Sequence, residues 1–247
     1  SAYSEYYDLL YRDKDYSGES RYVIDRLRQS MGRRPNSILE LGCGTGKHAE
    51  LFQAEGLKVA GVDLSATMIE QARTRLPGGT FVEGDVRTVR LGSTFESVVS
   101  LFHVASYQTS NDDILAFLQT AAAHLEPGGV FLFDFWYGPA VYVQQPVVRI
   151  RRMEDERVSI LRTAEPVHRY NDSIVEVHYE VIVEDKSTAR VERIREKHLM
   201  RYFFLPELKL MLANVGFNAG LAIFEEWMTG GILGGNSWGA TAIVRRT

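Results

Sequence analysis

SILELGCGTGK, from Ser37 to Lys47, is the stretch of sequence that decides the fold. A short apolar run leads directly into three alternating glycines, Gly42, Gly44 and Gly46, and apolar residues at helical spacing follow from Lys47. Glycine tolerates positive φ and lets a ligand approach the backbone. The start of the following helix offers unpaired N–H groups and the positive end of a dipole. The stretch therefore predicts a strand, a loop and a helix that bind a polar or negatively charged small molecule.

Three kinds of nucleotide loop follow a strand in this way, and glycine spacing separates them. A P-loop needs Ser or Thr after its Gly-Lys pair, and another glycine five positions before the glycine of that pair. Here His48 follows Gly46-Lys47, and Leu41 occupies the position of the earlier glycine. A dinucleotide fingerprint needs G-x-G-x-x-G, and its last glycine is missing. An acid followed by x-G-x-G-x-G, the methyltransferase nucleotide loop, is complete from Glu40 to Gly46. A plain tight turn is the remaining alternative, and three glycines behind an acid count against it.

A second acid, Asp63, ends the next apolar strand, about 20 residues after the first glycine, where α/β nucleotide-binding folds bind a ribose. A carboxylate at this place can accept hydrogen bonds from both hydroxyls of an adenosine ribose. The alternative is that Asp63 caps the following helix. Because Ser65 is better placed for that cap, the pattern favours a ligand role for Asp63.

With these motifs in place, the chain resembles the class I S-adenosylmethionine-dependent methyltransferases. Gly84-Asp85-Val86 resembles their third motif, and the turn over residues 125–130 (LEPGGV) resembles the one before their fifth strand. The resemblance implies that the Asp85 carboxylate meets the adenine amino group and that the Val86 backbone N–H meets the ring. It implies S-adenosyl-L-methionine as cofactor, with the following cofactor-binding residues: Tyr16, Glu40, Gly42, Gly44, Gly46, Asp63, Leu64, Met68, Gly84, Asp85, Val86 and Leu101.

The rest of the chain predicts an α/β fold with a change of pattern after Pro146. Before that point short strands alternate with helices, which predicts a mostly parallel sheet covered on both faces. Residues 147–200 show period-2 alternation, which predicts an inserted antiparallel sheet with one wet face. We expect a Rossmann-like, seven-stranded class I methyltransferase sheet with an inserted antiparallel β sub-domain. Its segments are a helical lid (1–36), a cofactor-binding core (37–146), the insertion (147–203) and the completion of the core sheet (204–247).

Individual elements of the core are expected at definite positions. The helix that starts at Asn111 or Asp112 should run through Leu125 and be ended by the Pro-Gly-Gly that follows. The fifth strand should then occupy residues 130–135, and the last two strands residues 217–227 and 239–245.

Composition limits the partners. Lys plus Arg number 28 and Asp plus Glu 32, for a net charge of -4, which argues against a nucleic-acid binder. A lone cysteine, Cys43, cannot form an internal disulfide, and no apolar run has membrane-spanning length. We expect a cytoplasmic protein with a small-molecule substrate, no metal, and neither nucleic acid nor membrane as partner. An exposed strand edge in the insertion could pair two copies as a homodimer.

The methyl acceptor should lie beyond the carboxyl ends of the strands. After the fourth strand come Phe102 and His103, where His103 is either a general base or a lining residue of the cofactor pocket. The Asn/Asp-Pro-Pro-aromatic signature of base-amine methyltransferases is absent from this stretch, which counts against a nucleic-acid acceptor. The insertion carries six arginines that form a solvated face or contact a diphosphate or carboxylate: Arg149, Arg151, Arg152, Arg157, Arg162 and Arg169.

The start of the chain adds a narrower resemblance. Residues 7–11 (YDLLY), followed by Lys14-Asp15-Tyr16 and Glu19, look like the start of the bacterial nucleotide-sugar N,N-dimethyltransferases. That resemblance implies methylation of an amino-sugar, with Tyr7 and Tyr16 closing over the cofactor and Tyr107 near the acceptor amine. The family tends to have Ser-Gly-Arg-Gly before its last strand, whereas residues 236–239 read NSWG.

Two other functions stay open at this point. An O-methyltransferase would use His103 as general base for a hydroxyl, and the catalytic residues are in either case expected to be Tyr7, His103 and Tyr107. A non-catalytic cofactor-binding protein would need a blocked acceptor pocket, and the sequence shows no blocked motif.

Overall fold

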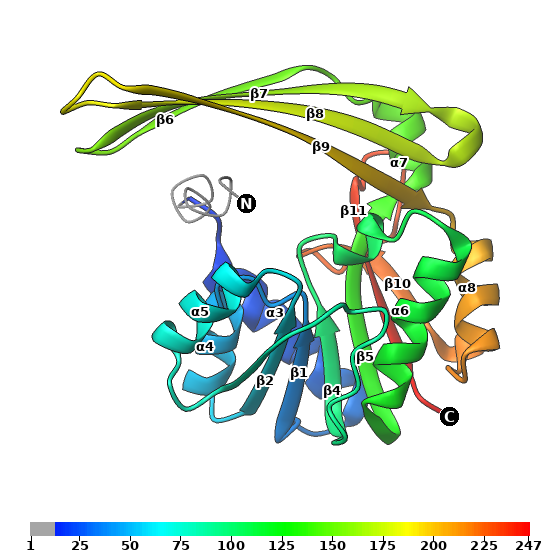
Figure 1. Ribbon diagram of the computed structural model, residues 1–247. Helices are drawn as coiled ribbons and strands as arrows, with labels where there is room; N and C mark the ends of the chain where they lie inside the picture. The colour runs from blue at the N-terminus through cyan, green and yellow to red at the C-terminus, as the bar shows by residue number, and fades with distance from the viewer. Residues whose placement is uncertain (1–12) are drawn as a thin grey trace.

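The computed structural model describes residues 13–247 (Figure 1). Its centre is a seven-stranded sheet in the order β3-β2-β1-β4-β5-β11-β10. The first five strands pair in parallel, and β11 is antiparallel to both β5 and β10. The strands are β1 (Ser37–Leu41), β2 (Lys58–Asp63), β3 (Thr80–Glu83), β4 (Phe95–Ser100), β5 (Leu125–Tyr137), β10 (Ile223–Glu226) and β11 (Gly239–Arg245).

Helices cover both faces of this sheet, so the predicted α/β class is confirmed. One apolar cluster joins α3, α4 and α5 to one face through residues such as Leu27, Phe52 and Ile69. A second cluster joins α6 and α8 to the other face through residues such as Phe117 and Leu208. The helices are α3 (Tyr16–Met31), α4 (Lys47–Ala54), α5 (Ala66–Arg75), α6 (Asn111–Ala123), α7 (Gly138–Gln144) and α8 (Leu205–Asn214).

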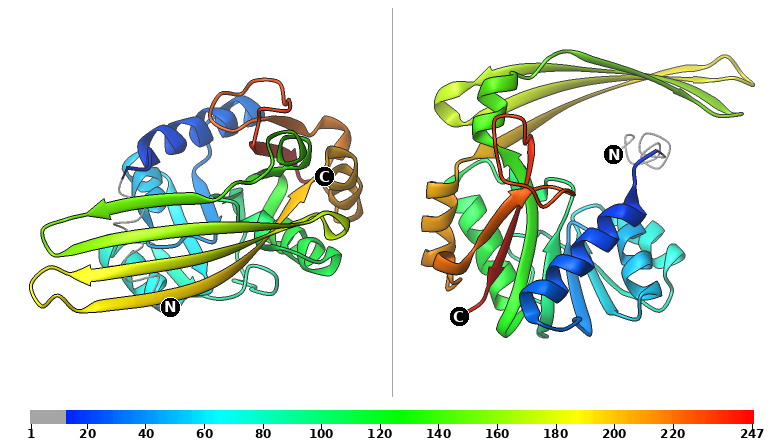
Figure 2. Two further views of the ribbon diagram at one scale, coloured as in Figure 1. Left: turned by 90° about the horizontal axis from the view of Figure 1, so that it is seen from above. Right: turned by 180° about the vertical axis from the view of Figure 1, so that it is seen from behind.

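The inserted antiparallel sheet is also confirmed. Its four strands pair in the order β6-β7-β8-β9 and extend over the carboxyl-terminal edge of the core sheet (Figures 1 and 2). The two sheets are joined where Trp136 and Tyr137 of β5 pair with Tyr202 and Phe203 of β9. The inserted strands are β6 (Arg149–Glu154), β7 (Val158–Arg169), β8 (Ile174–Asp185) and β9 (Val191–Phe203). The exact division of the chain at residues 36, 146 and 203 stays a prediction.

The predicted boundaries between one helix and the strand that follows it are wrong. The α6 helix stops at Ala123, and β5 already begins at Leu125, ahead of the Pro-Gly-Gly that should have ended the helix. The strand can extend there because the Gly128 N–H donates to the Arg246 carbonyl (3.2 Å) and the Arg246 N–H donates to the Gly129 carbonyl (2.9 Å). These contacts come from the far end of the chain and leave no signal in the local sequence.

The sixth core strand is shorter than expected. Only Ile223–Glu226 (β10) forms the strand, and a short 3-10 helix, Ala219–Leu221, takes the place of the first half of 217–227. Phe217 makes a single bridge with Arg246 and packs into the core. Within residues 13–247, no helix is long and apolar enough to cross a bilayer.

Candidate active site

The glycine loop is held against the neighbouring strand by backbone hydrogen bonds. The N–H groups of Gly42 and Cys43 donate to the Val62 carbonyl at 2.7 and 2.9 Å. Gly42 has a φ of +83°, and a Cβ there would lie 2.5 Å from a methyl of Val104. Gly44 has a φ of +53°, and nothing lies within 4 Å of the place its Cβ would take. The first glycine is therefore required by packing, and the second leaves open space for a ligand.

Asp63 fixes this loop from the end of β2. Its Oδ2 accepts a hydrogen bond from the Gly44 N–H, and its Oδ1 accepts one from the Ser65 N–H, both at 2.9 Å. The Ser65 hydroxyl accepts from the Met68 N–H at 3.4 Å, so Ser65 caps α5 as predicted. Each carboxylate oxygen offers more than one lone pair. Asp63 therefore holds the loop and keeps acceptor capacity for two hydroxyl groups of a ligand.

A small cavity opens between the loop and α3. Five predicted cofactor-binding residues line it: Tyr16, Glu40, Gly42, Gly44 and Leu101. Four residues that were not predicted also line it: Cys43, Thr45, Lys47 and His48.

Glu40 is the buried acid of this cavity. Burial raises the pKa of Glu40, and its Oε2 has no hydrogen-bond partner among residues 13–247. An unpartnered buried carboxylate oxygen is costly unless a ligand completes it, and the ammonium of an amino acid is a suitable donor. Glu40 Oε2 thus offers an acceptor for the ammonium group of S-adenosylmethionine, and the open space at Gly44 lets a ligand approach the backbone.

A buried chain of charges connects α3 with Glu40. Lys14 pairs with Glu19, the Glu19 Oε2 lies 2.7 Å from Nε2 of His48, and Nδ1 of His48 lies 3.4 Å from Glu40 Oε1. The Tyr16 ring packs 5.0 Å from the His48 ring. Burial works against the charged form of His48, but the hydrogen bonds to Glu19 and Glu40 outweigh it and raise the pKa of His48. This role of His48 was not predicted, because position 48 belongs to none of the recognised motifs.

This chain of charges predicts a pH-dependent stability. A raised histidine pKa contributes stability fully below its ordinary value near 6.5, and the contribution is lost as pH rises through the folded-state pKa. His48→Gln should therefore lower the free energy of unfolding by about 3 kcal/mol at about pH 6 and by less at about pH 9. Urea unfolding at both pH values measures this. The same replacement at the half-exposed His178 is the control. An equal loss of unfolding free energy for His48→Gln at both pH values would contradict the assignment.

The remaining predicted cofactor-binding residues differ in their exposure and packing. Leu64 beside Asp63 is 70% exposed, whereas Met68 is buried. The Gly84 N–H donates to the Asp63 carbonyl at 2.9 Å, which brings the third motif against the second. Val86 packs against the core, and Gly46 caps α4 with a φ of +77°. The contacts of these residues with the cofactor stay predictions.

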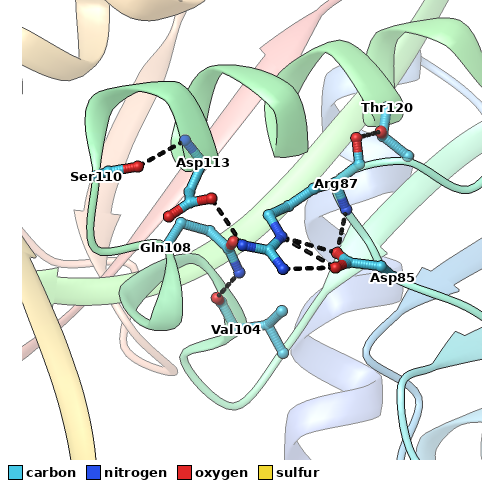
Figure 3. Close-up of polar contacts among 7 residues, drawn as sticks. All are labelled: Asp85, Arg87, Val104, Gln108, Ser110, Asp113 and Thr120. Atoms are coloured by element: carbon cyan, nitrogen blue, oxygen red, sulfur yellow. Dashed lines mark hydrogen bonds and ion pairs between the residues drawn. The ribbon is translucent and has the colours of Figure 1, made fainter.

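Asp85 has a partner that the sequence did not reveal (Figure 3). The Arg87 guanidinium contacts both Asp85 oxygens, with its shortest contact at 2.6 Å, and also bonds Asp113 of α6 at 2.7 Å. These contacts with Arg87 hold the pKa of Asp85 below its usual value. A contact between Asp85 and an adenine amino group stays a prediction, and it would have to be shared with Arg87.

His103 occupies a strained position at the end of β4. Phe102 and His103 have φ values of 65° and 64°, a region that residues other than glycine rarely adopt and that is concentrated at functional sites. The His103 N–H donates to Oδ1 of Asp134 at 2.8 Å, and its Nδ1 lies 2.9 Å from Oδ2. Asp134 is buried in β5. The Nδ1 atom is close to the carboxylate but makes no aligned hydrogen bond with it, so the backbone bond to Asp134 anchors this turn, and His103 remains a candidate proton acceptor beside a buried carboxylate.

Tyr107 connects the core to the insertion. Its hydroxyl lies 2.8 Å from Nδ1 of His198 on β9, and His198 Nε2 lies 3.0 Å from a Glu196 oxygen. Tyr7, the third predicted catalytic residue, lies outside the described residues. No group of three or more His, Cys, Asp or Glu side chains within residues 13–247 is arranged to hold a metal ion.

Comparisons with known proteins agree with this geometry. Residues 38–129 match the family model of the methyltransferase domain. A Streptomyces venezuelae protein, dTDP-3-amino-3,4,6-trideoxy-alpha-D-glucopyranose N,N-dimethyltransferase, is 34% identical over 93% of both chains. The chain belongs to the class I S-adenosylmethionine-dependent methyltransferases. The predicted family, the enzyme class and the cofactor are thereby confirmed, and the non-catalytic alternative is not supported.

Further relatives of this methyltransferase show the same pattern. A dTDP-4-amino-2,3,4,6-tetradeoxy-D-glucose N,N-dimethyltransferase of Saccharopolyspora spinosa is 33% identical, with 88% of this chain and 86% of that protein covered. The crystal structure of Streptomyces venezuelae DesVI superposes with a TM-score of 0.82, at 28% identity and 98% coverage of both chains. The structure of CalS10 bound to S-adenosylmethionine, an amino pentose methyltransferase from Micromonospora echinaspora, gives a TM-score of 0.78 at 25% identity, covering 100% of this chain and 97% of that one.

Proposed function

We propose that this methyltransferase transfers a methyl group to the amine of an amino-deoxysugar. The observation that carries the proposal is the near full-length similarity to two amino-sugar N,N-dimethyltransferases. The His103–Asp134 pair supports it, because a protonated amine must lose its proton before its nitrogen can attack.

Each part of the site has a task in this reaction. Bound S-adenosylmethionine supplies an activated methyl group on a sulfonium. Asp63 holds the ribose hydroxyls, and Glu40 accepts hydrogen bonds from the ammonium of the amino-acid portion. Asp134 anchors the turn that carries His103, which takes the proton of the acceptor. Tyr107, fixed by His198, borders the acceptor, and Tyr7 and Tyr16 close over the cofactor.

Methylation of a hydroxyl group is the second candidate. It is favoured by the same His103–Asp134 pair, because a hydroxyl depends on a base more than an amine does. The amine is preferred because both relatives named above are N-methyltransferases.

Matched acceptors separate the two candidates. We expect transfer of a labelled methyl group to dTDP-linked 3-amino- or 4-amino-deoxysugars. Its rate should be at least about a hundredfold higher than the rate with matched sugars that carry a hydroxyl in place of the amine. Initial rates at fixed donor concentration provide the comparison. Faster transfer to the hydroxyl compounds would establish the second candidate instead.

A homodimer remains a proposal about the insertion. Its outermost strand, β6, pairs only with β7 in the described residues, so one edge offers unpaired backbone groups. Light scattering across a range of protein concentrations measures the mass.

A further inference from the structure

The inserted sheet is connected to the edge of the core sheet by a hydrogen-bonded row of three side chains. The Tyr107 hydroxyl lies 2.8 Å from Nδ1 of His198, and Nε2 of His198 lies 3.0 Å from Oε2 of Glu196. His198 and Glu196 are two residues apart on β9, so both side chains point to the same face of the strand. Two elements that are far apart in the sequence therefore meet at the Tyr107 hydroxyl.

Packing holds this row in place. The His198 ring lies 4.9 Å from the Tyr179 ring and 5.7 Å from the Tyr107 ring. The side chains of His198 and Glu196 are 20% and 22% exposed. Because the imidazole has a hydrogen-bond partner on each nitrogen and an aromatic ring on two sides, its orientation is fixed.

Glu196 determines the direction of the hydrogen bonds along the row. A carboxylate can only accept, so the neutral imidazole of His198 carries its proton on Nε2 and offers Nδ1 as an acceptor. The Tyr107 hydroxyl has one proton, and it donates that proton to Nδ1. Toward every other partner the Tyr107 oxygen can therefore only accept. A tyrosine without this row could act in either direction.

Tyr107 shares a turn with His103. The 3-10 helix η1 (Val104–Tyr107) follows His103 directly, after the carboxyl end of β4, and the Ser106 N–H donates to the His103 carbonyl at 2.8 Å. The Ser106 hydroxyl accepts from the Trp136 N–H of β5 at 3.0 Å, which fixes the turn against the neighbouring strand. Ligands of α/β sheets bind beyond this edge, so the candidate base and the accepting hydroxyl are placed on the ligand side of the sheet.

We propose that Glu196 and His198 are positioning residues that hold the Tyr107 oxygen as an acceptor for an N–H of the substrate amine, and that this contact ends the reaction after two methyl transfers. The inference rests on the proposed function, because it concerns the amine at the same site. A nitrogen attacks with its lone pair, and an N–H bonded to Tyr107 directs that lone pair toward the methyl carbon.

The number of protons on the nitrogen sets the limit. In each round the ammonium loses one proton to His103, its lone pair forms the N–C bond, and the electrons of the broken S–C bond stay on sulfur. A neutral primary amine keeps two N–H bonds and a neutral secondary amine keeps one, so both can donate to Tyr107. A neutral tertiary amine has none, and its lone pair is no longer oriented. A hydroxyl that has lost its proton also has none, so the same contact favours amines over hydroxyl groups.

Three acceptors test the limit directly: the unmethylated, monomethylated and dimethylated forms of one dTDP-linked amino-deoxysugar. The first two should accept a labelled methyl group, and the rate with the third should be at least about a hundredfold lower. Mass spectrometry counts the methyl groups in each product. Formation of a trimethylammonium sugar at a comparable rate, or arrest after one methyl group, would overturn the proposal.

Variants of the row test the role of Tyr107. Tyr107→Phe should lower kcat with the amine about tenfold, the effect of one lost hydrogen bond, and should reduce the preference for amines over matched hydroxyl sugars by a similar factor. His198→Phe should have a similar effect. Because His198 acts through Tyr107, the double variant should be no slower than Tyr107→Phe alone. Additive losses in the double variant would show an independent structural role for His198 and overturn the assignment.

The matched control is His178→Phe. His178 follows Glu176 by two residues on β8 and lies 2.9 Å from it, which repeats the spacing of Glu196 and His198. Its register partner is Lys197, so it points to the other face of the sheet. Turnover of His178→Phe and its product ratio should stay within about twofold of wild type. A loss equal to that of His198→Phe would overturn the assignment.

The tautomer of His198 can be measured without turnover. Nitrogen-15 spectra of the histidine-labelled wild-type protein report which ring nitrogen carries the proton, and the spectrum of His198→Phe assigns the signals. We expect the proton on Nε2, and a proton on Nδ1 alone would overturn the proposal. If the tautomer is as expected and no amine is methylated, the proposed function fails and the direction of the row stands. Methylation of amines at equal rates by wild type and Tyr107→Phe would give the opposite result.

Discussion

Asp63→Ala is expected to weaken binding of S-adenosylhomocysteine by about a hundredfold or more. Two hydrogen bonds to a charged acceptor contribute on the order of 1.5–3 kcal/mol each, and both would be lost with the carboxylate. The substitution also removes the anchor of the Gly44 N–H, which holds the loop in its binding conformation. Calorimetric titration of the purified variant measures the dissociation constant.

Asp63→Asn is the matched variant for this prediction. It keeps the size and one acceptor oxygen, so its loss should be smaller, about tenfold. Thermal unfolding shows whether either variant has lost its fold. An affinity within about threefold of wild type for Asp63→Ala would mean that the ribose is bound elsewhere.

Replacement of His103 should remove most turnover and leave cofactor binding intact. Asparagine is the suitable replacement, because it tolerates the left-handed backbone that His103 adopts, whereas alanine would add strain. Loss of a general base lowers kcat by about 10²–10⁴-fold. The dissociation constant for S-adenosylhomocysteine should be unchanged, because His103 is placed on the acceptor side.

The pH profile of the His103→Asn variant tells which atom attacks. If the acceptor is an amine, its own deprotonation replaces the missing base, and kcat should rise with pH until the amine is neutral. With a hydroxyl acceptor, kcat of this variant should not rise over the same pH range. Asp134→Asn should lower kcat by a smaller factor, since it disturbs only the bond that anchors the turn. Full activity of both variants would show that the pair has no part in catalysis.

Most of the cofactor half of the site could be predicted from the sequence, because its parts are local. The loop from Glu40 to Gly46 is one continuous stretch, and Asp63 ends the next strand of a parallel pair, so adjacency of the two follows from the fold class alone. The role of Ser65 as helix cap was predicted for the same reason, since a cap depends on neighbours only three residues away.

The parts that could not be predicted depend on contacts between distant segments. His103 meets Asp134 because β4 pairs with β5 up to Ser100 opposite Phe133, so the residues that follow β4 lie beside the continuing strand; nothing in the local sequence links the two residues. Arg87 reaches Asp113 on another element, and His48 connects two acids from α3 and β1. Sequence periodicity indicated that the insertion was a sheet, but only the register places Arg151 opposite Arg162.

The position of the transferred methyl group tests the central claim most directly. The protein is incubated with isotope-labelled S-adenosylmethionine and a dTDP-linked amino-deoxysugar, and the labelled carbon of the product is located by nuclear magnetic resonance. We predict that the label is bonded to the sugar nitrogen. A label bonded to oxygen, or an unmodified sugar in the presence of bound donor, would contradict the assignment of this chain as an amino-sugar N-methyltransferase.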